Sequence, residues 1–294
     1  MNMDKLKKEF SKFIDYKPLA LLGAMKHELH DNGYSDFLSN VSGYLYAKGN
    51  VPILLVAHVD TVFRYEEKDL FCDSENRVLW SPDGAGFDDR AGVLAIKHIV
   101  KQLGKNEKPH ILLTLGEETG GTGAIIATRE LPFKNKFKYI IELDRRGHDD
   151  CVFYECYNPK FIDYVQRFGF HIRSGSFSDI SFLAPEWGIG AVNLSIGYYN
   201  EHSYGEYLMV DDWLLTIDKV IKMIKNNRKA PYFKFVQKNN QVNTDKVITC
   251  ACCGLRVPSF NAVSIVDLGD FCEECYYDFI ATEWIGEADA KKLV

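Results

Sequence analysis

Histidines and acidic residues recur after apolar segments of this sequence, or just before a helical one, at positions where they could bind metal ions. The segment "HVDTVF" places His58 and Asp60 after the apolar run at residues 53–57. A histidine nitrogen can coordinate a metal, and an aspartate two residues away can accept its second ring N–H and fix the tautomer. Taken alone, the same pair is explained equally well as the polar end of a strand.

Polar clusters of the same kind occur at four later points of the chain. They comprise Asp88 and Asp89 in "GFDDRAG", Glu117 and Glu118 in "GEETGGTGA", Asp144 in "ELDRRG", and His202 in "NEHSYGEY". Histidine and carboxylate ligands suit zinc, and also cobalt or manganese. So many acidic groups in one pocket would repel one another unless cations neutralised them. Two metal ions sharing one carboxylate would satisfy this set, and adjacent glutamates can supply one ligand and one general base.

Whether these clusters meet depends on the elements that carry them. Helical periodicity predicts helices over residues 3–14, 18–31, 90–103, 159–168 and 211–225. Apolar runs predict strands over residues 41–47, 52–57, 110–115, 139–143, 151–156 and 191–196. The alternation predicts an α/β fold, a three-layer α/β/α sandwich with a mostly parallel central sheet. Because ligands bind beyond the carboxyl ends of such strands, the clusters should converge at one edge.

The motifs together resemble one known group of enzymes. They are "AHVDTV", "GFDDRAG", "GEETGGTGA", "ELDRRG" and "NEHSYGEY", and they occur in that group's order. The chain resembles the co-catalytic di-zinc exopeptidases and deacylases, which include peptidase T, bacterial zinc aminopeptidases and acetylornithine deacetylase. The resemblance covers residues 15–225. Each motif is weakly specific by itself, whereas all five in order are highly specific.

The resemblance implies a role for each matching residue. It assigns His58 and Asp144 to one metal ion, Glu118 and His202 to a second, and Asp88 to both as the bridging ligand. Asp60 would orient His58, and Glu117 would be the general base. Asp89 is the alternative to Asp88 as the bridging residue. The implied cofactors are two zinc ions, with cobalt or manganese as other options.

The same resemblance implies hydrolysis of amide bonds by a metal-bridging water, with Glu117 as the base. In this group an aspartate at the position of Asp144 goes mostly with aminopeptidases. The sequence therefore favours an aminopeptidase that acts on small peptides. The alternative is an N-acyl amino acid deacylase or a carboxypeptidase. A non-catalytic scaffold is less favoured, since all the expected positions are intact.

Relatives of peptidase T insert a lid or dimerisation domain between the last two ligands. Here only residues 145–201 separate Asp144 from His202, which is too short for that insert beside the remaining sheet. We therefore expect a single-domain catalytic core in which Arg145 and Arg146 meet a substrate carboxylate in place of the lid. Asp179, in "FSDISF", is a further acidic residue, which we interpret as a neighbour of the ligands or a turn residue.

The last part of the chain carries a second metal-binding pattern. Cys250-x-x-Cys253 is followed by Cys272-x-x-Cys275. Two such pairs are a strong signal for a tetrahedral structural zinc in a zinc-ribbon-like module, with Cys252 as a spare thiol that could compete as a ligand. So small a module has little apolar core, and the metal would supply much of its folding energy. A disulfide cluster or an iron–sulfur cluster is a weaker alternative.

Composition narrows the classes of partner. The 294-residue chain has a formal net charge of -6, and 46% of its residues are hydrophobic. This charge gives no electrostatic basis for binding nucleic acid, and no segment is long and apolar enough to span a membrane. The N-terminal residues lack the apolar core of a signal peptide, so a cytoplasmic location is expected.

The expected organisation has three parts. They are a catalytic domain at residues 1–225, a linker rich in Asn and Lys at 226–246, and a zinc-ribbon-like module at 247–294. The expected substrate is a small peptide or an N-acyl amino acid. The C-terminal module is the expected surface for a protein partner or for a homo-oligomer.

Overall fold

A computed structural model describes residues 2–65, 67–237, 247–258, 262–265, 269–272 and 275. The chain divides into two compact units, Met1–Lys238 and Asn239–Val294. Within the described residues, no helix has both the length and the apolar character needed to cross a membrane.

The first unit is built on a central sheet of eight strands. In spatial order they are β1 (Phe37–Asn40), β2 (Tyr44–Ala47), β6 (Pro109–Thr114), β3 (Val51–His58), β7 (Tyr139–Arg145), β10 (Ala191–Ser195), β8 (Asp150–Val152) and β9 (His171–Ile172). The inner strands β6, β3, β7 and β10 run parallel, while β1 with β2, β2 with β6, and β8 with β10 pair antiparallel. The predicted α/β fold with a mostly parallel sheet is thereby confirmed.

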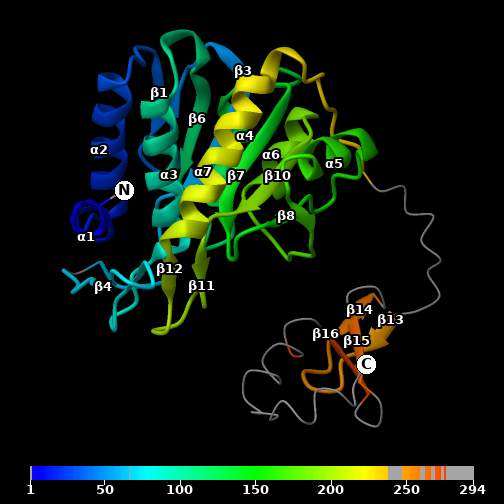
Figure 1. The fold of residues 1–294 in the computed structure, drawn as a ribbon. Coiled ribbons are helices and arrows are strands. Elements are labelled where there is room, and N and C mark those ends of the chain that lie inside the picture. Colours follow the sequence, from blue (N-terminus) through cyan, green and yellow to red (C-terminus); the bar gives the residue numbers. More distant parts are fainter. Residues whose placement is uncertain are drawn as a thin grey trace. The chain divides into compact units, whose positions relative to one another are not determined.

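Helices cover both faces of this sheet (Figure 1). They are α1 (Met3–Ile14), α2 (Pro18–Asp31), α3 (Phe87–Gln102), α4 (Thr122–Glu130), α5 (Pro159–Gln166), α6 (Ile180–Trp187) and α7 (Val210–Lys225), with short 3-10 helices at Lys105–Glu107 and Asn226–Arg228. Helices α1, α2, α3, α5 and α7 share one apolar cluster with the sheet, whereas α4 and α6 share a second cluster. These layers form the predicted three-layer sandwich.

The first two helices begin where local chemistry favours a helix start. The side chain of Asn2 caps α1 by accepting a hydrogen bond from the backbone N–H of Lys5 at 2.9 Å. Pro18 opens α2 at a position where no backbone N–H is needed and its fixed φ suits the helix. Both helices have the predicted bounds.

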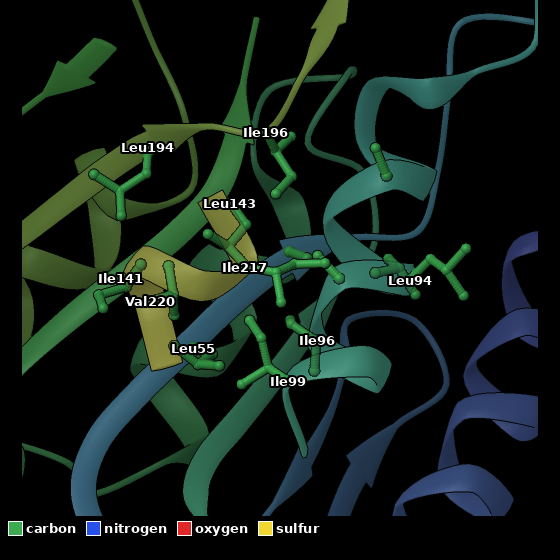
Figure 2. Close-up of a cluster of buried hydrophobic side chains, with 14 of the residues drawn as sticks. Leu55, Leu94, Ile96, Ile99, Ile141, Leu143, Leu194, Ile196, Ile217 and Val220 are labelled. Atoms are coloured by element: carbon green, nitrogen blue, oxygen red, sulfur yellow. The ribbon is translucent and has the colours of Figure 1, made fainter. Parts of the chain in front are cut away.

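The central strands are buried on both faces. Along β3, Leu55 belongs to the cluster on the α3 and α7 side, while Leu54 and Val56 belong to the cluster on the α4 and α6 side. Figure 2 shows Leu55, Ile141 and Ile99 in the first of these clusters. Burial of each such side chain contributes about 1.5–3 kcal/mol. This two-sided packing fixes the strands whose ends carry the polar clusters.

A second sheet has four antiparallel strands. In spatial order they are β11 (Tyr198–Tyr199), β12 (Tyr207–Met209), β5 (Val78–Trp80) and β4 (Phe71–Asp73). Tyr198 and Leu208 are buried on one face, whereas Phe71 and Trp80 are exposed on the other. These strands were not predicted, because two or three residues are too few to show a period.

The segment 226–237, expected to begin the linker, instead belongs to the first unit and packs against the rest of it. Ala230 and Phe233 are buried there. The backbone N–H of Phe233 donates to the carbonyl of Lys138, and its carbonyl accepts from Gly190, each at 2.8 Å. The apolar residues of this stretch thus outweigh its Asn- and Lys-rich composition. The prediction of a linker from residue 226 was wrong for these positions.

Two predicted strands are shorter in the structure. Residues 41–43 form a turn, so the strand expected at 41–47 begins at residue 44 as β2. The strand expected at 151–156 ends at residue 152 as β8, and a turn follows. In both cases the predicted segment includes residues whose backbone does not pair with a neighbouring strand.

The described part of the second unit contains two short antiparallel pairs. They are β13 (Val247–Thr249) with β14 (Arg256–Pro258), and β15 (Ala262–Ile265) with β16 (Gly269–Cys272). The turn after β13 closes through a hydrogen bond from Gly254 N–H to the carbonyl of Cys250 at 3.0 Å. Gly254 has a φ of 73°, which favours glycine. Cys250, Phe271 and Cys272 form a small buried core.

Candidate metal centre

The predicted ligands meet at the carboxyl edge of the parallel strands. His58 is the last residue of β3, Asp144 lies near the end of β7, and Glu118 follows β6. Asp88 stands in the first turn of α3, and His202 lies in the loop between β11 and β12. Residues far apart in the sequence thus converge where ligands of open α/β sheets bind.

Asp88 lies between the two histidines. Its Oδ1 is 3.0 Å from Nε2 of His58, and its Oδ2 is 3.2 Å from Nε2 of His202. Nε2 of His58 also lies 3.4 Å from Oδ1 of Asp144. Nε2 of His202 lies 3.0 Å from Oε2 of Glu118. Two groups of donors, one around each histidine, therefore share a single carboxylate.

This donor set fits metal ions. Ligand atoms of His58, Asp88 and Glu118 lie within 4.8 Å of one another, as do those of His58, Asp89 and Asp144. Within the described part of the chain, Oε1 of Glu118 is buried without a hydrogen-bond partner. A buried carboxylate oxygen in that state is costly unless a cation compensates it. Nitrogen and oxygen donors at this spacing suit zinc, cobalt or manganese.

Burial and charge shift the pKa values of the clustered groups. Burial opposes the charged form of Asp88, but hydrogen bonds to the two histidines outweigh it and lower the pKa of Asp88. Hydrogen bonds to Asp88 and Glu118 raise the pKa of His202 to about 11. Burial, reinforced by the charge of Asp144, raises the pKa of Glu117 to about 9. Protons thus compensate the carboxylates here, a task that bound cations can take over.

Asp60 supports both His58 and the pair of glutamates. Its Oδ1 is 3.5 Å from Nδ1 of His58. Its carboxylate also accepts hydrogen bonds from the backbone N–H groups of Gly116, Glu117 and Glu118, at 2.8, 3.4 and 3.2 Å. Within the described residues Nδ1 of His58 has no hydrogen-bond partner, so this approach to Asp60 is not the hydrogen bond that the sequence predicted. The bonds to the loop were not predicted. Asp60 therefore lies beside the histidine and holds the loop that carries both glutamates.

Asp89 has its carboxylate engaged by the backbone. Its Oδ2 accepts a hydrogen bond from the backbone N–H of His58 at 3.1 Å, and its Oδ1 accepts one from Gly92 at 3.0 Å. Asp88, by contrast, directs both oxygens toward histidine side chains. The geometry favours Asp88 as the shared carboxylate.

Three residues that the sequence did not single out also contact the predicted ligands. Glu206 accepts hydrogen bonds from backbone N–H groups at the start of α3. The hydroxyl of Tyr198 donates to Oδ1 of Asp144 at 3.2 Å, and the side-chain amide of Asn193 bonds the backbone of Asp144. Only Glu206 had a sequence signal, as an acidic residue four positions after His202 in the same motif.

The arginines expected to meet a substrate carboxylate already contact acidic residues. Arg145 lies 3.6 Å from Asp150, and Arg146 pairs with Glu201. Asp179 is fully buried and hydrogen-bonded to the side chain of the last residue of β6. Among the residues that the structure describes, Asp179 joins neither donor group.

Several solved structures that share this fold are described as peptidases, and another is a glutaminyl cyclase from Porphyromonas gingivalis. Aminopeptidase PepT from Bacillus cereus ATCC 10987 has a TM-score of 0.65 and 14% identity, over 78% of this chain and 99% of that chain. A tripeptidase from Staphylococcus aureus has a TM-score of 0.63 and 14% identity, over 78% and 99%. The TET1 peptidase of Pyrococcus horikoshii, which can assemble into a tetrahedron or a large octahedral shell, has a TM-score of 0.51 and 14% identity, over 68% and 92%.

These likenesses confirm the fold that the motifs implied. No protein-family model matches the sequence, and no curated protein matches it in sequence. The first unit is therefore an α/β unit that shares its fold with these structures and carries two groups of side chains with the spacing of metal ligands.

The second unit brings four cysteine sulfurs together. Those of Cys250, Cys253, Cys272 and Cys275 all lie within 4.8 Å of one another. Cys252 is exposed and outside this group. Hydrogen bonds from backbone N–H groups of the turn, that of Cys253 foremost, lower the pKa of Cys250 to about 6. Four sulfur ligands so arranged suit zinc.

Replacing Cys253 by serine is expected to remove the metal ion from the second unit. The change deletes one of four sulfur ligands, and metal binding supplies folding free energy to a module with so small a core. Metal analysis of the full chain should show one ion fewer than the wild type, and NMR signals of residues 247–258 should lose dispersion. Cys252→Ser is the matched control and should change neither quantity. Unaltered metal content in Cys253→Ser would argue against a four-cysteine site.

Proposed function

We propose that the first unit is a two-metal aminopeptidase that removes N-terminal residues from small peptides. One observation carries the proposal: Asp88 directs its two carboxylate oxygens at two different histidines, each of which has a further carboxylate beside it. A carboxylate shared between two such groups suits two adjacent metal ions.

The donor groups divide into two sets. His58, Asp144 and Asp88 would hold one ion, and His202, Glu118 and Asp88 would hold the other. When bound, the ions supply Lewis acidity that polarises a carbonyl and lowers the pKa of a water. Zinc suits this mixture of histidine and carboxylate ligands, with cobalt or manganese as substitutes.

Glu117 is the residue that moves protons in this proposal. It is adjacent to Glu118, its backbone N–H bonds Asp60, and its carboxyl lies within electrostatic reach of Asp144. Bound cations would replace the proton that burial keeps on Glu117 in the metal-free cluster. The ionised Glu117 then accepts a proton from the attacking water and returns it to the leaving amine, so that the base is regenerated in each cycle. Asp60 keeps His58 oriented throughout.

The charges beside the centre disfavour recognition of a substrate carboxylate. Arg145 and Arg146 are already paired with acidic residues, so a substrate carboxylate would have to compete for them. The pairing of these two arginines favours an aminopeptidase over a carboxypeptidase or an N-acyl amino acid deacylase, whose substrates carry a free carboxylate. Two of the structural neighbours are an aminopeptidase and a tripeptidase, which agrees with this choice.

A substrate panel tests the proposal on the full chain loaded with zinc, cobalt or manganese. The panel compares short peptides with free termini, the same peptides acetylated at the N-terminus, and the same peptides amidated at the C-terminus. We expect release of the N-terminal residue from the free and amidated peptides only. Turnover confined to acetylated substrates would indicate a deacylase, and a requirement for a free C-terminus would indicate a carboxypeptidase.

For the second unit we propose one structural zinc ion at the cysteine group and a role in contacting a protein partner or another copy of the chain. The assembly described for the TET1 peptidase supports the second option by analogy. Metal analysis that finds two exchangeable ions and one tightly held ion per chain would fit both the two-metal centre and the structural zinc. A single ion, lost only on unfolding, would instead favour a non-catalytic scaffold.

A further inference from the structure

One hairpin reaches three of the predicted ligands. It comprises β11, the loop at residues 200–206 and β12, with Tyr198 paired with Leu208 across the strands. His202 sits in its loop and faces Asp88 and Glu118. The same hairpin contributes the side chains of Tyr198 and Glu206, which contact other parts of the centre.

Glu206 holds the backbone around Asp88. Its Oε2 accepts hydrogen bonds from the N–H groups of Gly86 and Phe87 at 2.6 and 3.0 Å, and its Oε1 accepts one from Asp88 at 3.0 Å. Glu206 is fully buried. Gly86, at the N-cap of α3, has no side chain to satisfy these donors, so a residue of the hairpin caps the helix instead. The segment that carries Asp88 is therefore held to the hairpin by these hydrogen bonds.

Tyr198 holds the side chain of Asp144. Its hydroxyl donates to Oδ1 of Asp144 at 3.2 Å, and that same oxygen lies 3.4 Å from Nε2 of His58. The tyrosine is buried, so its ring position is set by packing. Asn193 binds the backbone of Asp144, which leaves Tyr198 to orient the carboxylate itself.

The loop at the tip of the hairpin needs contacts with its surroundings to keep its conformation. Asn200 and His202 have φ values of 57° and 60°, in the left-handed region that L residues disfavour. The side chain of His202 is 52% exposed, so packing alone does not fix it. Conformations of this kind persist when the surrounding contacts over-determine them. Glu206 and Tyr198 supply contacts at the two ends of the loop.

We propose that the β11–β12 hairpin is a clamp that sets the relative positions of the two metal ions, with Glu206 and Tyr198 as its positioning residues. This inference rests on the proposed two-metal function. Glu206 couples His202 to the bridging residue Asp88, and Tyr198 couples the hairpin to the ligand Asp144. The clamp thus reaches both donor groups from one element, although neither residue is itself a ligand.

Glu206→Gln and Tyr198→Phe test the clamp in the full chain. An amide has one acceptor oxygen where the carboxylate had two, and phenylalanine keeps the buried ring but removes the hydroxyl. Loss of a contact that orients a metal ligand typically weakens metal affinity about 10- to 100-fold. We expect that loss for the exchangeable ions in each variant, measured by competition with a chromogenic chelator. The absorption spectrum of the cobalt-loaded protein should shift as well.

Tyr199→Phe is the matched control. Tyr199 neighbours Tyr198 on the same strand, but its hydroxyl donates to Asp212 at 2.6 Å and not to the centre. The metal affinity and the cobalt spectrum of Tyr199→Phe should equal those of the wild type. Thermal unfolding of each metal-free variant reports stability separately from metal binding, and Tyr198→Phe serves alone if Glu206→Gln does not fold.

Wild-type affinity and an unchanged cobalt spectrum in Tyr198→Phe would overturn the clamp while leaving the two-metal site in place. A wild-type protein that binds no ion beyond the one at the cysteine group would instead overturn the proposed function itself. Equal weakening in Tyr198→Phe and Tyr199→Phe would show a general effect of hairpin stability and would also overturn the clamp.

Discussion

Replacing Glu117 by glutamine is expected to lower kcat by about 10²- to 10⁴-fold while the centre keeps both exchangeable metal ions. Glutamine has nearly the shape of glutamate but cannot take a proton from water. The predicted ligands are other residues, and the backbone N–H that Asp60 holds is unaffected by the change. Steady-state kinetics on a short peptide and metal analysis of the same sample measure the two quantities.

Glu118→Gln is the matched control for this experiment, because it makes the same chemical change one position further along. Oε2 of Glu118 lies 3.0 Å from Nε2 of His202, and its Oε1 is buried. This variant should lose activity together with one metal ion. If Glu117→Gln lost the metal, or if it kept wild-type turnover, Glu117 would not be the general base.

Replacing Asp88 by asparagine is expected to remove both exchangeable ions and to reduce hydrolysis to background. Only Asp88 faces both histidines among the described carboxylates, so its charge serves both donor groups. Asparagine keeps the size of the side chain but removes the negative charge and one acceptor oxygen. Metal analysis after dialysis should find only the ion of the cysteine group, and peptide hydrolysis should not recover when zinc is restored at stoichiometric concentration.

Asp89→Asn distinguishes the bridging residue from its neighbour. Its two carboxylate oxygens accept backbone hydrogen bonds from His58 and Gly92. An asparagine leaves one of these donors without an acceptor, which costs about 1–3 kcal/mol of unfolding free energy. Both exchangeable ions should nevertheless bind. The reverse pattern, with metal retained in Asp88→Asn and lost in Asp89→Asn, would assign the bridge to Asp89.

Much of the fold was predictable because its signals are local. The helices at 3–14 and 18–31 have the bounds of α1 and α2, since their apolar spacing and their starts lie within the segments themselves. The long inner strands were recognisable as apolar runs buried on both faces. Short elements such as β4, β5, β9, β11 and β12 were not predicted, because each is too short to show periodicity.

Three of the candidate ligands were also predictable, because each lies at or just after the end of a strand that the sequence reveals. His58 follows the run at 53–57, Glu118 follows β6 and Asp144 ends β7. The rule that ligands of open α/β sheets bind beyond the carboxyl strand ends then brings them together. The order of the five motifs added the implied role of each residue.

The contacts that hold these ligands could not be predicted in the same way. Glu206 bonds Asp88 across 118 positions of the chain, and Tyr198 bonds Asp144 across 54. Asp88 and Asp89 are adjacent and chemically identical, yet one faces two histidines and the other faces the backbone. The amino-acid sequence establishes which groups are available and which strand ends carry them. Only tertiary packing decides which groups meet, because long-range contacts between the sheet, α3 and the hairpin set the direction of each side chain.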